Sequence, residues 1–275
     1  MMRSGILIAS FAVVGCSYFQ SKATTEPAAS PTAKASASGG PGAGLRLATS
    51  AGLLKAIHDR YDGKFLKTMS FLQNNTQYTS TGAEKKSQWY EHIEVPGKLR
   101  IAFLPATTKS GLVQVDDKVA SFDNGIRVDF RRSVNPLLLL TADVYVAPTA
   151  AIMRGLDSLH VDTEVMHDDE WDGQPVYVVG AKAGDTTANQ MWVDRDHLRL
   201  VRFIQRSKQG DRTNVSDIHV QNYKEIQGFE IPTEFLVIRN GRPFWRERYA
   251  DVRINEEFPA GTFDLARWND IPIPK

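Results

Sequence analysis

The side chains best suited to metal binding or proton transfer are scattered through this sequence. It has six histidines, and no two of them stand four residues apart, the spacing that would place both on one helix face. One acidic run, Asp168–Asp172, lies beside His167 and could meet a hard cation. The run lacks the regular spacing of a calcium loop and ends at Asp172-Gly173, a pair typical of a hairpin turn. We therefore expect a solvated turn here and no metal site.

Motifs for covalent or phosphoryl chemistry are also missing. The sequence contains no G-x-S-x-G nucleophile elbow, no G-x-x-x-x-G-K-[ST] phosphate loop and no H-E-x-x-H zinc motif. The Gly-rich stretch 40–44 follows no predicted strand and includes a proline, which argues against a nucleotide loop. We predict that the chain is not an enzyme, has no catalytic residues and needs no cofactor.

Composition and net charge indicate which classes of protein this chain can belong to. The chain has 275 residues, 42% of them hydrophobic and 24% charged, which is typical of a globular protein. Its 33 Lys and Arg nearly balance its 32 Asp and Glu, for a net charge of +1. A nucleic-acid-binding protein usually carries a basic excess to neutralise phosphates, so we expect no nucleic-acid partner.

The one cysteine stands at the end of an N-terminal apolar run. Arg3 precedes Ile6–Val14, a run too short to span a bilayer and typical of a signal peptide. The run leads into Val13-Val14-Gly15-Cys16, which resembles the bacterial lipobox, in which a signal peptidase cleaves before an acylated cysteine. The alternative is an ordinary secretory signal with a cysteine nearby by chance. The resemblance implies that residues 1–15 are removed and that Cys16 is the lipid attachment site, holding the protein to a membrane through fatty acyl groups such as palmitate.

A tether is predicted between this cysteine and the folded domain. All but two of the residues from 23 to 44 are Ala, Ser, Thr, Pro or Gly, a composition that buries too little apolar surface to order the chain. We interpret residues 16–46 as an acylated cysteine with a disordered tether and residues 47–275 as the domain. Ser17 favours the outer over the inner membrane, because an Asp after the cysteine favours inner-membrane retention in well-studied lipoproteins.

The domain reads as mainly antiparallel β-structure with helices. Leu53, Leu54, Ile57 and Tyr61 recur at helical spacing after a capping Thr49 or Ser50. A second helical region includes Pro136–Leu140 and a helix beginning near Pro148. About ten strands are predicted around them, among them a strand from 161 to 171. Residues 229–238 alternate most clearly between apolar and polar, so one sheet face must be covered.

A set of segments, taken in order, resembles the outer-membrane lipoprotein-sorting family, the LolA/LolB-like periplasmic carriers and acceptors. The segments are Phe65–Phe71, Val95–Arg100, Asp172–Gly180, Met191–Asp194, Gly228–Pro232, Ile254-Asn255 and Phe263. The resemblance covers roughly residues 50 to 265. It implies an α+β fold, an incomplete antiparallel β-barrel with a helical lid over a hydrophobic concave face. The predicted lipobox makes the chain more similar to the membrane-anchored acceptor than to the soluble carrier.

The resemblance further implies a cavity for acyl chains, which bind because apolar surface leaves water. The candidate lining residues are Trp89, Ile93, Ile101, Phe103, Leu138, Leu139, Ile152, Met153 and Phe235. The same periodicity is expected of residues that only fill a core. The run Leu137–Leu140 is a candidate movable lid or lipid-inserting segment, and it could equally be a buried helical turn.

Two functional hypotheses remain open. The first is an envelope lipoprotein that binds lipid, or the acyl chains of other lipoproteins, for transfer or insertion. The second is a periplasmic sensor or assembly module that uses the same fold to bind an envelope protein partner, because a fold alone does not fix its ligand.

Overall fold

The computed structural model describes residues 47–272, apart from the side chain of Gln209. The predicted signal peptide, Cys16 and the tether lie outside the described residues. The helices are α1 (Ser50–Tyr61), α2 (Pro136–Thr141) and α3 (Thr149–Ser158). The strands are β1 (Thr68–Tyr78), β2 (Glu84–Glu94), β3 (Lys98–Phe103), β4 (Gly111–Val115), β5 (Lys118–Asp123), β6 (Ile126–Arg132), β7 (Met166–Trp171), β8 (Gln174–Val179), β9 (Gln190–Asp194), β10 (Leu200–Gln209), β11 (Arg212–Ile226), β12 (Phe229–Arg239) and β13 (Arg242–Ile254).

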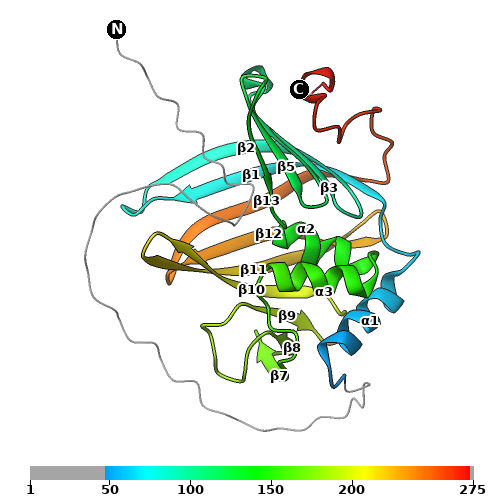
Figure 1. Ribbon diagram of the computed structural model, residues 1–275, viewed down its shortest axis with the longest axis vertical. Coiled ribbons are helices and arrows are strands. Elements are labelled where there is room, and N and C mark those ends of the chain that lie inside the picture. Colours follow the sequence, from blue (N-terminus) through cyan, green and yellow to red (C-terminus); the bar gives the residue numbers. More distant parts are fainter. Residues whose placement is uncertain (1–46, 273–275) are drawn as a thin grey trace.

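The strands of the described chain form one antiparallel sheet in the order β6-β5-β4-β3-β2-β1-β13-β12-β11-β10-β9-β8-β7. The chain runs outward from β1 to the edge strand β6 and then crosses through α2 and α3. It resumes with β7 at the opposite edge and returns strand by strand to β13, which pairs with β1. Figure 1 shows the sheet curving around the helices. The predicted mainly-β fold with an unclosed sheet is confirmed, and thirteen strands replace the ten expected.

Two Asn-Gly pairs explain the tightest hairpins. Asn124 and Gly125 join β5 to β6 with φ values of 51° and 77°, and Asn240 and Gly241 join β12 to β13 with 50° and 77°. Positive φ at both central residues defines the hairpin turn that matches strand twist, and Asn and Gly adopt it at least cost. An Asn-Gly pair between two apolar runs is the strongest short hairpin signal a sequence can carry, and both pairs form such turns.

The first helix agrees with its predicted pattern. The Oγ1 atom of Thr49 accepts a hydrogen bond from the backbone N–H of Gly52 at 3.1 Å, which caps α1. Leu53, Leu54 and Ile57 point into the core and are at most 2% exposed. The capping residue and the buried stripe thus direct the helix against the sheet.

The strand expected over 161–171 is shorter than predicted. Val161 makes only an isolated bridge to Asn189, and its N–H bonds back to the carbonyl of Leu156 in α3. This helix-terminal hydrogen bond uses the backbone group that a strand ladder would need. Regular pairing therefore begins at Met166.

The two faces of the sheet are covered by different parts of the chain. The side chains of Leu99 and Ile101 join the large apolar cluster that also contains the three helices. Arg100, between them, points to the opposite face, since side chains alternate along a strand. On that face a second cluster includes Trp268 from the C-terminal segment 255–272. We call the helix-covered side the concave face and the other the convex face (Figure 1). Among residues 47–272, no helix has the length and apolar character needed to cross a bilayer.

Candidate functional site

Helix α2 lies over the middle of the concave face, and the residues at its N-terminus fix where it begins. The side chain of Asn135 accepts hydrogen bonds from the N–H groups of Leu137 and Leu138 at 3.0 and 3.2 Å. Pro136 occupies the first turn, where a missing N–H costs nothing. Because the helix has only six residues, packing of its leucines rather than backbone propensity holds it in place.

A close contact between α2 and α3 fixes the position of the leucine run. A Cβ atom at Gly155 of α3 would lie 2.7 Å from Cδ2 of Leu139, closer than real Cβ contacts come. The absence of a side chain at Gly155 therefore lets the two helices approach. Leu138, Leu139 and Leu140 are buried, and Leu137 is half-buried.

A small cavity of about 60 Å³ lies beneath α2. Residues from β1, β2, β3, β13 and α2 meet around it. Its lining consists of Gln73, Trp89, Glu91, Ile93, Leu99, Ile101, Asn135, Pro136, Leu137, Leu138, Thr141, Glu247 and Tyr249. The walls are mostly apolar, with two carboxyl groups among them.

A second, smaller cavity of about 20 Å³ lies beside the first. The two share Ile93, Thr141 and Tyr249. The second is lined further by apolar residues: Phe65, Leu66, Met69, Ala142, Ile231, Pro232 and Phe235. We call the two together the α2 cavity.

The structure brings most of the predicted lining residues to this region. Trp89, Ile93, Ile101 and Leu138 line the first cavity, and Phe235 lines the second. Phe103 packs on Trp89 with ring centroids 5.1 Å apart. Leu139 and Ile152 are buried in the same apolar cluster, and Met153 packs against it. In this structure, side chains fill most of the space between the helices and the sheet.

Four polar residues on the concave face escaped the sequence analysis: Gln73, Asn75, Glu91 and Glu247. Glu91 stands between Trp89 and Ile93 in β2, so the alternation that turns those two residues inward turns Glu91 inward as well. The alternation along β2 therefore indicates the position of Glu91. Selecting only apolar residues as lining leaves out a polar residue on the same face of the strand.

Burial dominates the electrostatics of the two carboxyl groups. Glu91 and Glu247 are only 5% and 9% exposed. Burial raises the pKa of Glu247 to about 7, against a smaller lowering by the hydrogen bond from Trp245. Burial also raises the pKa of Glu91 well above its usual range, and the nearby Glu247 raises it further. The effect of burial is the cost of a charge in a site of low polarity, and the effect of Glu247 on Glu91 is repulsion between like charges.

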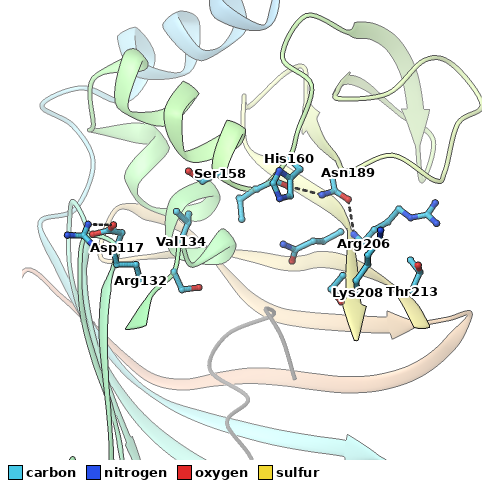
Figure 2. A pocket seen from close by; sticks show the side chains of 13 residues that line it. Asp117, Arg132, Val134, Ser158, His160, Asn189, Arg206, Lys208 and Thr213 are labelled. Atoms are coloured by element: carbon cyan, nitrogen blue, oxygen red, sulfur yellow. Dashed lines mark hydrogen bonds and ion pairs between the residues drawn. The ribbon is translucent and has the colours of Figure 1, made fainter. Parts of the chain in front are cut away.

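A second depression, a groove of about 810 Å³, lies between the end of β6 on one side and β10 and β11 on the other. Figure 2 shows Asp117 and Arg132 on one side, Arg206, Lys208 and Thr213 on the other, and His160 between them. Its walls carry mainly charged, hydroxyl and amide groups, with Val134 and Leu159 as exceptions. None of the predicted lining residues reaches it, so the α2 cavity fits an apolar ligand better.

The acidic run Asp168–Asp172 spans the end of β7 and its turn. Its carboxylates contact His167 and Arg195, each at 3.6 Å. Over the described residues, no three His, Cys, Asp or Glu side chains gather as a metal-binding group.

No protein-family model matches the chain, and no curated protein matches it in sequence. Solved structures that share its fold include the following three. A LolA superfamily protein from Nitrosomonas europaea is 14% identical, with a TM-score of 0.53 over 79% of this chain and 98% of its own. A DUF1329 family protein from Desulfovibrio piger is 16% identical, with a TM-score of 0.52 over 78% and 95%. A Vibrio parahaemolyticus domain named for outer-membrane lipoprotein sorting is 12% identical, with a TM-score of 0.52 over 78% and 96%.

The chain thus has the fold of the lipoprotein-sorting proteins, as its segments indicate. The likeness covers nearly the whole length of each of the three proteins. At these identities it defines the architecture, and the site must be argued from this chain's own residues.

Proposed function

We propose that the chain is a membrane-anchored envelope lipoprotein that binds lipid, or the acyl chains of other lipoproteins, beneath its helices. The observation that supports this most is the α2 cavity, where a short leucine-rich helix covers apolar walls inside a sheet of the lipoprotein-sorting fold. In this proposal α2 acts as a lid. Displacement of α2 would expose the side chains now packed against it and admit a hydrocarbon chain.

Membrane attachment belongs to the same proposal. Acylation of Cys16 would hold the domain at the membrane from which it takes, or to which it delivers, its ligand, with the outer membrane favoured by Ser17. Residues 1–15 would be the signal peptide, 16–46 the lipidated tether and 47–275 the binding domain. The proposed activity is transfer without covalent chemistry, with no catalytic residue.

The test uses the polypeptide from Ser17 to Lys275, which keeps every described element and lacks the acylated cysteine. It is purified without detergent, extracted with organic solvent and analysed by mass spectrometry. We expect lipid at a near-stoichiometric level. A folded protein that is empty and also takes up no added phospholipid or lipopeptide would contradict the proposal.

The edge strand β6 supports a second candidate, a module that binds a protein partner. Ile126, Val128 and Phe130 are 69%, 55% and 53% exposed, and among the described strands β6 has a neighbour on one side only. An extended segment of another protein could add a strand there. If this candidate is right, a photo-crosslinker at Val128 captures one envelope protein in cells, and Phe130→Glu abolishes the capture while lipid content is unchanged.

A further inference from the structure

Two buried carboxyl groups stand on the concave face on the two strands that flank β1, at positions four residues apart along it. Glu91 in β2 pairs across the ladder with Phe71 of β1, and Glu247 in β13 pairs with Asn75 of the same strand. Both side chains line the α2 cavity. Two acidic groups in an otherwise apolar site are costly to keep, so their presence calls for a reason.

Their hydrogen bonding is incomplete. Oε1 of Glu247 accepts from the indole Nε1 of Trp245 at 3.0 Å. Oε1 of Glu91 has no hydrogen-bond partner in the described part of the chain, and neither has Nδ2 of Asn75. A buried polar atom without a partner costs about 1–3 kcal/mol. Of these two atoms, only the Glu91 oxygen belongs to a residue that lines the cavity, and it is an acceptor that a donor on a ligand could satisfy.

The missing partner is a donor of positive charge. No Lys, Arg or His is among the described residues that line the α2 cavity, on β1, β2, β3, β13 or α2. The other titratable group there is Tyr249, whose pKa burial raises well above its ordinary value. An ammonium ion offers three N–H donors and a full charge, and it forms hydrogen bonds to carboxylates that are about twice as strong as neutral ones.

We propose that Glu91 and Glu247 bind the primary ammonium group of an amphiphile whose hydrocarbon chain extends from the α2 cavity along the apolar concave face. The inference rests on the proposed lipid-binding function and specifies its ligand. The chain would leave the carboxyl groups past Ile93 and Tyr249, the residues that join the two parts of the cavity. Such an ammonium group can come from the head of an amine-bearing lipid or from the α-amino end of a lipopeptide.

Binding is coupled to proton release. A carboxyl group that is protonated in the empty site gives its proton to solvent when the ammonium ion arrives, and the carboxylate that remains pairs with the ligand's charge. The raised pKa values of the pair are consistent with this exchange at neutral pH. Binding should therefore strengthen from pH 5 to pH 8, and the number of protons released per bound ligand should be largest at the acidic end of this range.

The experiment compares dodecylammonium, dodecanol and dodecanoate below their micellar concentrations, by calorimetry on the Ser17–Lys275 polypeptide in buffers of different ionisation enthalpy. We expect dodecylammonium to bind about tenfold or more tightly than dodecanol, with proton release. The double variant Glu91→Gln/Glu247→Gln should bind all three probes alike. Glu84→Gln, an exposed change on the same strand β2, should leave the preference intact.

The outcomes separate the two proposals. Equal binding of the three probes to the unmodified polypeptide overturns the ammonium site and leaves lipid binding standing. Binding of none of them overturns lipid binding itself. The comparison of head groups needs no variant, so it holds even if the double variant does not fold.

The source of the ammonium group is then identified with two matched pairs. One pair is vesicles of an amine-bearing phospholipid and of its N-acetylated form. The other is a diacylated lipopeptide with a free α-amine and its N-acetylated form. We expect acetylation to abolish uptake in at least one pair. If acetylation weakens neither, the inference is wrong.

Discussion

The two faces of the sheet each bury charged side chains, and they treat them differently. On the convex face Arg100 is 1% exposed and donates to the carbonyl of Trp268 at 2.9 Å and to those of Thr262 and Ile271 at 3.5 Å. Its guanidinium also lies 4.0 Å from the centre of the Trp268 ring. On the concave face Glu91 keeps an oxygen without a partner.

This difference separates a structural charge from a functional one. The partners of Arg100 all come from the C-terminal segment, so its bonds hold that segment to the sheet. The hydrogen-bond partners of Arg100 all belong to the chain itself, as expected of a structural charge. A carboxyl oxygen without a partner beside a cavity can gain its hydrogen bond from a ligand, which is the role we propose for Glu91.

The largest effect on stability is expected from replacing Arg100. Arg100→Met removes the donors and leaves three buried carbonyls without them, so the free energy of unfolding should fall by about 3 kcal/mol or more. Urea denaturation measures the loss, and limited proteolysis should cut the released segment 255–272. Lys85→Met, an exposed change on β2, serves as the control. Unchanged stability would show that the partners of Arg100 do not hold the segment.

On the concave face, replacing the buried Glu247 is expected to raise stability at neutral pH. Because the pKa of Glu247 is about 7 in the folded protein and near 4.5 when unfolded, the folded state binds the extra proton between these values. Stability contributed by this group is therefore present below pH 4.5 and is lost as the pH rises to 7, by up to about 3 kcal/mol.

Glu247→Gln removes this loss, so the variant should gain stability over the unmodified protein as the pH is raised from 4.5 to 7. Urea denaturation at several pH values measures the difference between the two profiles. Taking the difference cancels buried groups that do not interact with Glu247, such as His92, whose pKa is lowered to about 4 mainly by burial. Parallel profiles would mean that Glu247 is not perturbed as described.

The smallest effect concerns the helix that covers the cavity. Asn135→Ala removes the side-chain oxygen that caps α2 and should lower stability by about 1 kcal/mol. Hydrogen exchange should become faster in the amides of α2 and stay unchanged in segment 255–272. Equal acceleration in both would indicate global destabilisation rather than a loosened lid.

Much of the architecture could be predicted because it depends on local patterns. The Asn-Gly turns, the cap at Thr49 and the alternation of β12 all act over a few residues, and each is where the sequence indicates. The predicted start of the strand at Val161 was wrong, because the N–H of Val161 bonds back to α3 and pairing begins only at Met166.

The candidate site could be predicted only in part. Periodicity identifies which side of β2 is apolar, and so places Trp89 and Ile93 correctly on the concave face. It carries no information on what lies across the sheet, so the approach of Glu91 to Glu247 depends on the pairing of β1 with β13. That pairing joins residues at least 168 positions apart, such as Asn75 and Glu247.

The strand order also has a consequence for how the chain reaches its native state. Strands β1 to β6 and β7 to β13 are two runs of neighbouring hairpins, and only the β1–β13 ladder joins them. Local hairpins close quickly, whereas a ladder between distant segments closes slowly. We expect the two runs to form first and the central ladder last. Glu91 belongs to one run and Glu247 to the other, so the mutual repulsion of the carboxyl groups, when both are ionised, opposes only this final step, and mildly acidic conditions should speed it.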